Sequence, residues 1–107
     1  MRVLSVCVDL MDRSRIVAGH PDVEFVRTVV VAIQRVGLGD VDLVLVDLSL
    51  SSDIAQLRAL VATGVRIVAY GPHVDDSLLA TARDAGCHEV LPRSRFFHHV
   101  ASLNGKD

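Results

Sequence analysis

Five short apolar runs recur along the chain, and the intervals between them leave room for a helix. The strongest run, residues 42–48 (DLVLVDL), holds four consecutive apolar residues instead of alternating with polar ones. Strands of this composition are buried on both faces, which is typical of a parallel sheet covered by helices. We therefore expect strands at 3–8, 22–26, 42–48, 65–70 and 87–91.

The segments between these runs carry helix signals. Capping residues precede three of the segments, and glycines follow several of them, where a helix would end. We expect helices over about 12–18, 53–63, 75–85 and 94–103, with N-caps at Asp53, at Asp75 or Asp76, and at Ser94.

Residues 27–36 are ambiguous. The β-branched stretch 28–31 favours a strand. Val29, Ile33 and Val36, however, fall at helical spacing, and Gly37 lies where a helix would stop. We predict a helix, because two parallel strands need a crossover between them.

Strands that alternate with helices and join by right-handed crossovers form a doubly wound α/β fold. For five such units we expect a parallel five-stranded sheet in the flavodoxin-like order 2-1-3-4-5, and a single domain over residues 1–107. The first and fifth strands are not neighbours in that order. Cys7 and Cys87 would then lie too far apart to bridge, so we expect two free thiols.

Composition narrows the possible functions. Half of the residues are hydrophobic and the net charge is −2, which is unlike a strongly basic nucleic-acid-binding protein. No apolar run reaches the ~18 residues of a membrane span. The apolar stretch at the N-terminus could also be interpreted as a signal peptide, but Asp9 and Asp12 interrupt it. We expect a cytoplasmic protein with neither nucleic acid nor membrane as its partner.

Polar residues gather where the expected strands end. Ligands of open α/β sheets bind at the carboxyl ends of the strands, near the point where the strand order reverses. The residues expected at that edge are Asp9 and Asp12, Asp47, residues 71–73 and residues 93–95. Asp47 stands out because an apolar strand gives way there to a carboxylate. It also has an ordinary interpretation, in which it only caps the following turn.

Two segments carry a resemblance to a known family. LVLVDLSL is similar to the third strand of a CheY-like receiver domain of bacterial two-component response regulators, which ends in a phospho-accepting aspartate. RIVAYGPHVDDSLLATARDAGCHEVL is similar to the family's fourth strand, helix and fifth strand. The resemblance covers nearly the whole chain and implies that Asp47 is the phospho-acceptor position. It further implies a possible Mg²⁺ site at Asp9 and Asp47.

Several positions depart from the family's pattern. Leu10 stands where receivers have a second acid, and Gly71 (or Tyr70) stands where they have a hydroxyl residue. Arg93 replaces a lysine. Because the arginine fork holds a carboxylate by two bonds and stays charged, a permanent pair of Arg93 with Asp47 could replace both metal and phosphate.

The resulting hypothesis is a stand-alone, atypical receiver-like module that binds a protein partner, is not an enzyme and is not phosphorylated in the standard way. One alternative is a phosphorylatable single-domain response regulator that uses Asp47, with Asp12 or water in place of the missing acid. A second alternative is a small flavodoxin-like enzyme or ligand-binding domain. The glycine-free segment CVDLMDRSR argues against nucleotide binding.

The partner surface implied by the resemblance is the face of the fourth helix, fifth strand and fifth helix. Adjacent Phe96 and Phe97 cannot both point into the core from one helix, so we expect at least one ring to be partly exposed and a homodimer or partner contact there. This surface would include Leu78, Leu79, Arg83, Glu89, Arg95, Phe96 and His99.

Overall fold

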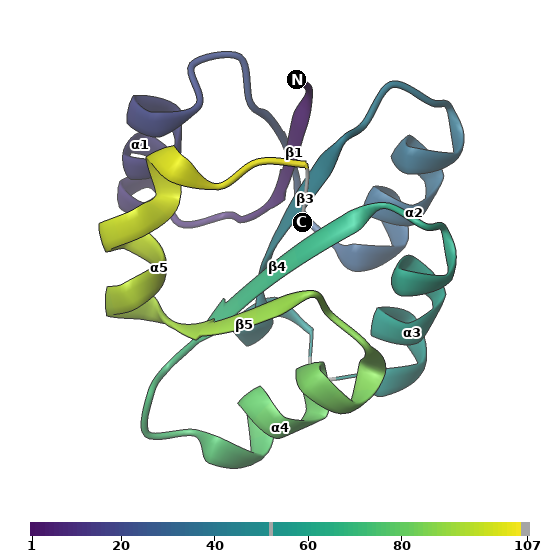
Figure 1. Ribbon diagram of the computed structural model, residues 1–107, viewed down its shortest axis with the longest axis vertical. Coiled ribbons are helices and arrows are strands. Elements are labelled where there is room, and N and C mark those ends of the chain that lie inside the picture. The colour runs from purple at the N-terminus through teal and green to yellow at the C-terminus, as the bar shows by residue number, and fades with distance from the viewer. Residues whose placement is uncertain (52, 106–107) are drawn as a thin grey trace.

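The structure, a computed structural model, describes residues 1–51 and 53–105. Five parallel strands form one sheet in the order β2-β1-β3-β4-β5, which confirms the predicted topology (Figure 1). The strands are β1 (Val3–Val6), β2 (Glu24–Val26), β3 (Leu43–Asp47), β4 (Arg66–Gly71) and β5 (Glu89–Pro92).

Helices cover both faces of the sheet. In Figure 1, α1 and α5 lie on one side, while α2, α3 and α4 lie on the other. The helices are α1 (Leu10–Gly19), α2 (Val29–Gly37), α3 (Ile54–Ala62), α4 (Asp76–Ala85) and α5 (Arg93–His99). Two 3₁₀ turns, η1 (Leu48–Leu50) and η2 (Val100–Ser102), follow β3 and α5.

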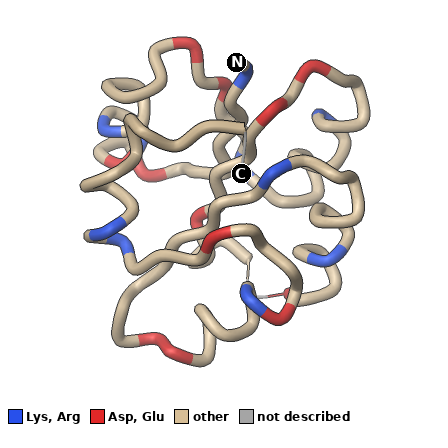
Figure 2. Tube along the Cα trace, viewed as in Figure 1, with Lys and Arg blue, Asp and Glu red and all other residues tan. Residues whose placement is uncertain are grey.

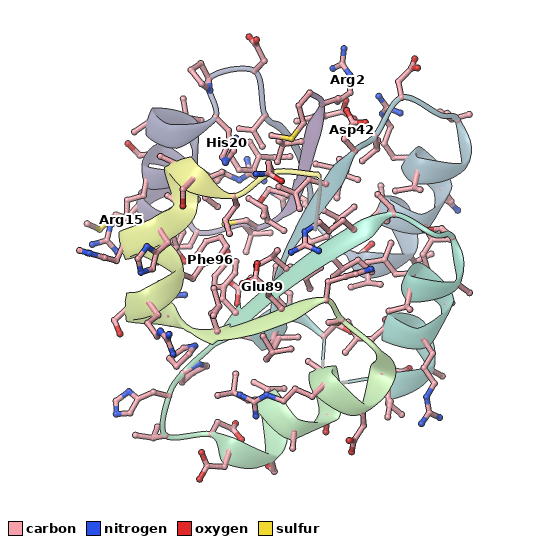
Figure 3. The ribbon with its side chains drawn as sticks, in the orientation of Figure 1. Arg2, Arg15, His20, Asp42, Glu89 and Phe96 are labelled. Carbon is pink, nitrogen blue, oxygen red and sulfur yellow. The ribbon has the colours of Figure 1, made fainter. Side chains whose placement is uncertain are left out.

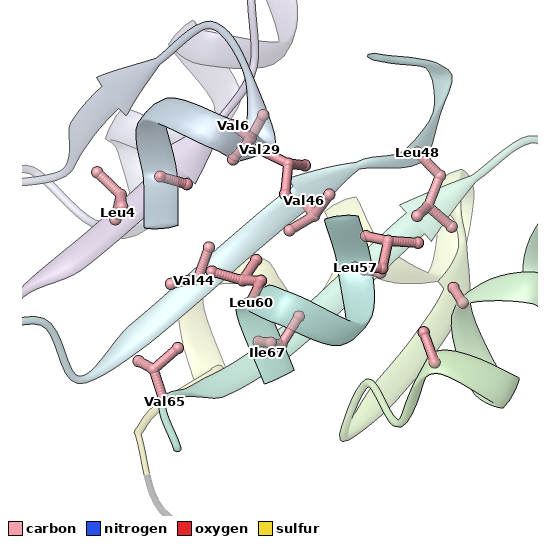
Figure 4. Packing of buried hydrophobic residues seen from close by; sticks show 14 of the residues in the cluster. Leu4, Val6, Val29, Val44, Val46, Leu48, Leu57, Leu60, Val65 and Ile67 are labelled. Atoms are coloured by element: carbon pink, nitrogen blue, oxygen red, sulfur yellow. The ribbon is translucent and has the colours of Figure 1, made fainter. Parts of the chain in front are cut away.

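The central strand β3 explains why the sheet has two hydrophobic cores. All of its residues are buried, and successive side chains point to opposite faces. Val44 and Val46 pack with Leu57 and Leu60 of α3 (Figure 4). Leu43 and Leu45 pack on the other face, in a core that contains Phe96 of α5. Burial on both faces is what the uninterrupted apolar run predicted.

Local capping sets where the helices begin. The helix over 27–36 is confirmed: the Thr28 side chain accepts a hydrogen bond from the Val31 amide and caps α2. The caps at Asp53 and Asp75 are confirmed as well. The predicted Ser94 cap is wrong. The last helix begins at Arg93, directly after the strand-ending Pro92, and has no side-chain cap.

The start of α1 also differs from the expectation. The helix begins at Leu10 and not near residue 12, because the Asp9 carboxylate accepts a hydrogen bond from the Asp12 amide at 2.9 Å. Asp12 therefore lies inside the first turn and is buried. This shift decides which acid enters the site described below.

The two cysteines are free, as expected. Cys7 is fully buried in the core beneath α1 and α5, and Cys87 packs against the core on the opposite face of the sheet. Burial raises the pKa of Cys87 to about 11, so its thiol stays protonated at neutral pH.

No helix within residues 1–51 and 53–105 combines the length and the apolar character needed to cross a membrane.

Candidate functional site: a buried cluster at the carboxyl end of the sheet

The site lies where β1, β3 and β4 end, because parallel strands bring their carboxyl ends to one edge. Asp47 is the last residue of β3 and pairs in register with Tyr70 of β4. Cys7 follows β1, and Arg93 opens α5 directly after β5. Three of these four side chains are buried, and Arg93 is partly exposed.

Asp47 is held by the turn that follows it. Its Oδ1 accepts hydrogen bonds from the Ser49 amide at 3.0 Å and from the Ser49 hydroxyl at 2.7 Å. The carboxylate thus caps η1, as the ordinary interpretation of this residue predicted. Capping uses one carboxylate oxygen and leaves the other oxygen of Asp47 free at the carboxyl end of the sheet.

Arg93 binds Asp12 and not Asp47. Its Nη2 lies 2.7 Å from Oδ1 of Asp12, and the two side chains are 37% and 6% exposed. The hydrogen bond from Arg93 to Asp12 raises the arginine pKa, so the guanidinium stays charged. The proposed Asp47–Arg93 pair is therefore wrong. Asp12 reaches Arg93 first, because α1 begins two residues earlier than predicted.

The acid expected to join Asp47, Asp9, caps α1 and is exposed. Its place beside Asp47 is taken by Asp12 and Cys7. One ligand atom from each of Cys7, Asp12 and Asp47 lies within 4.8 Å of the others, and all three residues are buried. We call these three residues the Cys–Asp cluster. Burial raises the pKa of the Cys7 thiol, the neighbouring Tyr70 hydroxyl lowers it in part, and the carboxylates of Asp12 and Asp47 raise it further.

Tyr70 lies beside the Cys–Asp cluster. Its ring stacks on Phe96 with centroids 4.0 Å apart, and the Arg93 guanidinium lies 5.8 Å from the ring centroid. The side chain is fully buried, yet its hydroxyl has no hydrogen-bond partner in the described part of the chain. Burial raises the Tyr70 pKa far above its ordinary value, and Cys7 and Asp47 contribute to the rise.

Replacing Tyr70 by phenylalanine should therefore stabilise the metal-free protein. Near neutral pH we expect a gain of about 1 kcal/mol, because a buried hydroxyl without a partner is removed. Above about pH 10 the gain should grow by up to ~1.4 kcal/mol per pH unit. In that pH range Tyr70 ionises in the unfolded wild type but stays protonated in the folded wild type. The free energy of unfolding of the wild type therefore falls as pH rises, whereas that of Tyr70→Phe lacks this contribution. Urea denaturation of both proteins across this range measures the difference.

Tyrosinate absorbance provides the control, since Tyr70 is the only tyrosine in the chain. The absorbance of the folded protein should stay flat until the protein unfolds. A rise centred on the ordinary tyrosine pKa would contradict the assignment.

Gly71, the position where receivers have a hydroxyl residue, lies in an apolar environment. A Cβ built on Gly71 would meet Leu48, Leu78 and Leu79 side-chain atoms, each at 3.5 Å. The residue is buried. The chain thus offers no hydroxyl at this position, and Gly71 is surrounded by leucine side chains.

Two members of the expected partner surface are buried and so are excluded from it. Leu79 packs in the core beneath α4, and Phe96 points from α5 toward the sheet (Figure 3). The prediction that one of the two adjacent rings would be partly exposed is confirmed, because Phe97 is half-buried. Leu78 and Glu89 are also half-buried, and the three basic members of the surface, Arg83, Arg95 and His99, are exposed.

Comparisons with known proteins identify the fold. No family model matches the chain, and no curated protein matches it either. A response regulator from Hahella chejuensis superposes with a TM-score of 0.79 at 21% identity, over 94% of this chain and 89% of that one. The receiver domain of TorR, a response regulator of the TMAO respiratory system, has a TM-score of 0.76 at 16% identity, over 86% and 82% of the two chains. The Mn²⁺-bound response regulator Rcp1 has a TM-score of 0.75 at 12% identity, over 94% and 89%. The chain has the fold of response-regulator receiver domains.

The donor set of the Cys–Asp cluster does not suit the Mg²⁺ ion that the family resemblance implies. Mg²⁺ requires oxygen ligands in near-octahedral geometry. Here a thiol stands beside two carboxylates, and one of those carboxylates already binds Arg93. Cys7 was the residue that sequence reasoning missed. The signal was available, since Val3, Ser5 and Cys7 alternate toward one face of the sheet and Cys7 falls where the strand ends.

Proposed function

We propose that the chain is an atypical receiver-like signalling module, a single domain that works in the cytoplasm by binding a protein partner and not by catalysis. Its partner contact does not depend on phosphorylation of Asp47 by the family's standard route. The observation that carries this proposal is the pair of Arg93 with Asp12, joined at 2.7 Å across 81 residues of sequence.

The reasoning is chemical. A transferred phosphoryl group needs cations and hydrogen-bond donors around its oxygens. At this edge of the sheet Arg93 is engaged by Asp12, and Gly71 has no hydroxyl to offer. Arg93 holds a buried carboxylate, so the start of α5 is already tied to α1 without any phosphate.

The proposed partner surface is the part of the α4–β5–α5 face that is not buried: half-buried Leu78 and Glu89, and exposed Arg83, Arg95 and His99. Exposed apolar side chains at the carboxyl end of the sheet support contact with a protein as well. Leu10 and Met11 at the start of α1 are 78% and 77% exposed, and Val74 after β4 is 79% exposed. Figure 2 shows basic and acidic segments interspersed along the trace, a pattern that suits a protein partner better than a nucleic acid.

One observation favours the alternative of a phosphorylatable regulator. Asp12 places a second buried carboxylate within reach of Asp47, in the role that Leu10 cannot fill.

Treatment with a small-molecule phosphodonor and Mg²⁺ distinguishes the two. We expect intact-protein mass spectrometry to show no stable phosphoryl adduct, and sedimentation velocity to show the same association state with and without the donor. Asp47→Ala is the matched control and should behave as the wild type does. An adduct on the wild type that Asp47→Ala abolishes would establish the phosphorylatable regulator instead.

A further inference from the structure

We propose that the Cys–Asp cluster binds a thiophilic divalent cation of the Zn²⁺ class in preference to Mg²⁺, with the Cys7 thiolate and one oxygen each of Asp12 and Asp47 as ligands. Zn²⁺ accepts this mixture of sulfur and carboxylate donors, whereas Mg²⁺ selects oxygen alone. The inference stands whether or not the domain signals through a partner.

The spacing of the donor atoms suits a small ion. The three atoms lie within 4.8 Å of one another. Ligands at about 2.0–2.3 Å from Zn²⁺ lie about 3.3–3.8 Å apart in a tetrahedral site. Small side-chain rotations therefore suffice to close the cluster around an ion. Binding would displace the thiol proton of Cys7 to solvent.

Free donor oxygens remain on both carboxylates. Ser49 donates to Oδ1 of Asp47, and Arg93 donates to Oδ1 of Asp12. Within the described residues, no hydrogen bond reaches Oδ2 of either aspartate. The hydrogen bonds from Ser49 hold the Asp47 carboxylate in place, as outer partners do around metal ligands.

Tyr70 supplies the second, independent observation. Its fully buried hydroxyl lies beside the Cys7 thiol but is not oriented to make a well-formed hydrogen bond with any described residue, although buried polar groups are normally paired. Tyr70 lies opposite Asp47 in the β3–β4 register and shares a core with Cys7. A bound cation, or a water on it, would give this hydroxyl the partner that it lacks.

Arg93 is a competitor for the ion. Its guanidinium already neutralises Asp12 and lies at the edge of the cluster. Removing that charge by Arg93→Gln should raise Zn²⁺ affinity several-fold, a result opposite to that of every ligand substitution.

Co²⁺ provides the direct test, because a cobalt–thiolate bond gives a charge-transfer band in the near ultraviolet. Co²⁺ is titrated into the reduced, metal-free chain. We expect the band to appear, to be abolished by stoichiometric Zn²⁺, and to survive a large excess of Mg²⁺. Absence of the band, or equal competition by Mg²⁺, would overturn the proposal.

The two cysteines give a matched pair of variants. Cys7→Ser should lose the band and weaken Zn²⁺ binding by more than about 100-fold. Cys87→Ser, on the other face of the sheet, should retain both. Unchanged Zn²⁺ affinity in Cys7→Ser would show binding at surface histidines and refute the site.

Because Cys7 is fully buried, circular dichroism must show that Cys7→Ser folds. Asp47→Asn keeps the shape of the side chain and serves as the second variant. It should keep the sulfur band while weakening Zn²⁺ binding at least ~10-fold. An unchanged affinity in Asp47→Asn would overturn the proposed ligand set even if Cys7→Ser failed to fold.

Discussion

Phe96→Ala should lower the free energy of unfolding by about 3–5 kcal/mol, the usual cost of truncating a fully buried aromatic ring. Phe96 is 0% exposed and stacks on Tyr70 with centroids 4.0 Å apart. It is the buried residue of α5 and belongs to the same core as Ile16 of α1. A domain of this size has a total stability of roughly 5–15 kcal/mol, so the variant should be close to unfolding. Urea denaturation followed by circular dichroism measures the loss.

Phe97→Ala is the matched control. This ring is half-buried and meets Phe96 edge-on with centroids 4.9 Å apart. Because solvent already reaches it, we expect a loss of only about 1 kcal/mol. Equal losses for the two variants would contradict the orientation of α5, and with it the position of Arg93 at the start of that helix.

The sheet was predictable because its burial is visible in the sequence. Residues 43–47 are all buried, and the continuous apolar run over 43–46 is typical of a strand covered on both faces. Residues 28–31 show the limit of local pattern. Their β-branched side chains favour a strand, and α2 formed there because a crossover was needed and Thr28 supplied a cap. Topology outweighed local propensity.

Helix starts were harder, because several residues compete to cap. Asp9 and Asp12 are both good N-caps, and the sequence does not say which of them caps the helix. The structure uses Asp9, which turns Asp12 inward toward Arg93. At α5 the strand runs directly into the helix after Pro92, so Ser94 lies inside the first turn and does not occupy the N-cap position.

The location of the site could be predicted from the sequence, but the side-chain contacts within it could be predicted less well. Asp47 and Arg93 were placed at the correct edge from the ends of their strands. The partner of Arg93 depended on a shift of two residues in α1, and Cys7 was expected only to be a free thiol. Side-chain pairing at a strand edge depends on ångström distances that periodicity does not encode.

That pairing leads to a second large effect: Arg93→Ala should destabilise the fold by about 2–3 kcal/mol. Breaking a buried ion pair typically costs 3–5 kcal/mol, because one charge is left buried and unpaired. Here Asp12 is 6% exposed but Arg93 is 37% exposed, so solvent screening reduces the cost. Urea denaturation of the metal-free chain near neutral pH measures it. The loss should change little with added salt, since the carboxylate left behind is buried.

Arg95→Ala controls for the loss of a surface arginine two residues along the same helix. Arg95 is exposed, so its removal should change stability by no more than about 0.5 kcal/mol. The double variant Asp12→Asn/Arg93→Ala removes the unpaired charge and should recover about 1–2 kcal/mol relative to Arg93→Ala alone. If Arg93→Ala cost no more than Arg95→Ala, the pair would contribute nothing to the fold. Asp12 would then not hold Arg93 in place, and Arg93 would be available to a phosphoryl group on Asp47. The missing hydroxyl at Gly71 would be the remaining obstacle to phosphorylation.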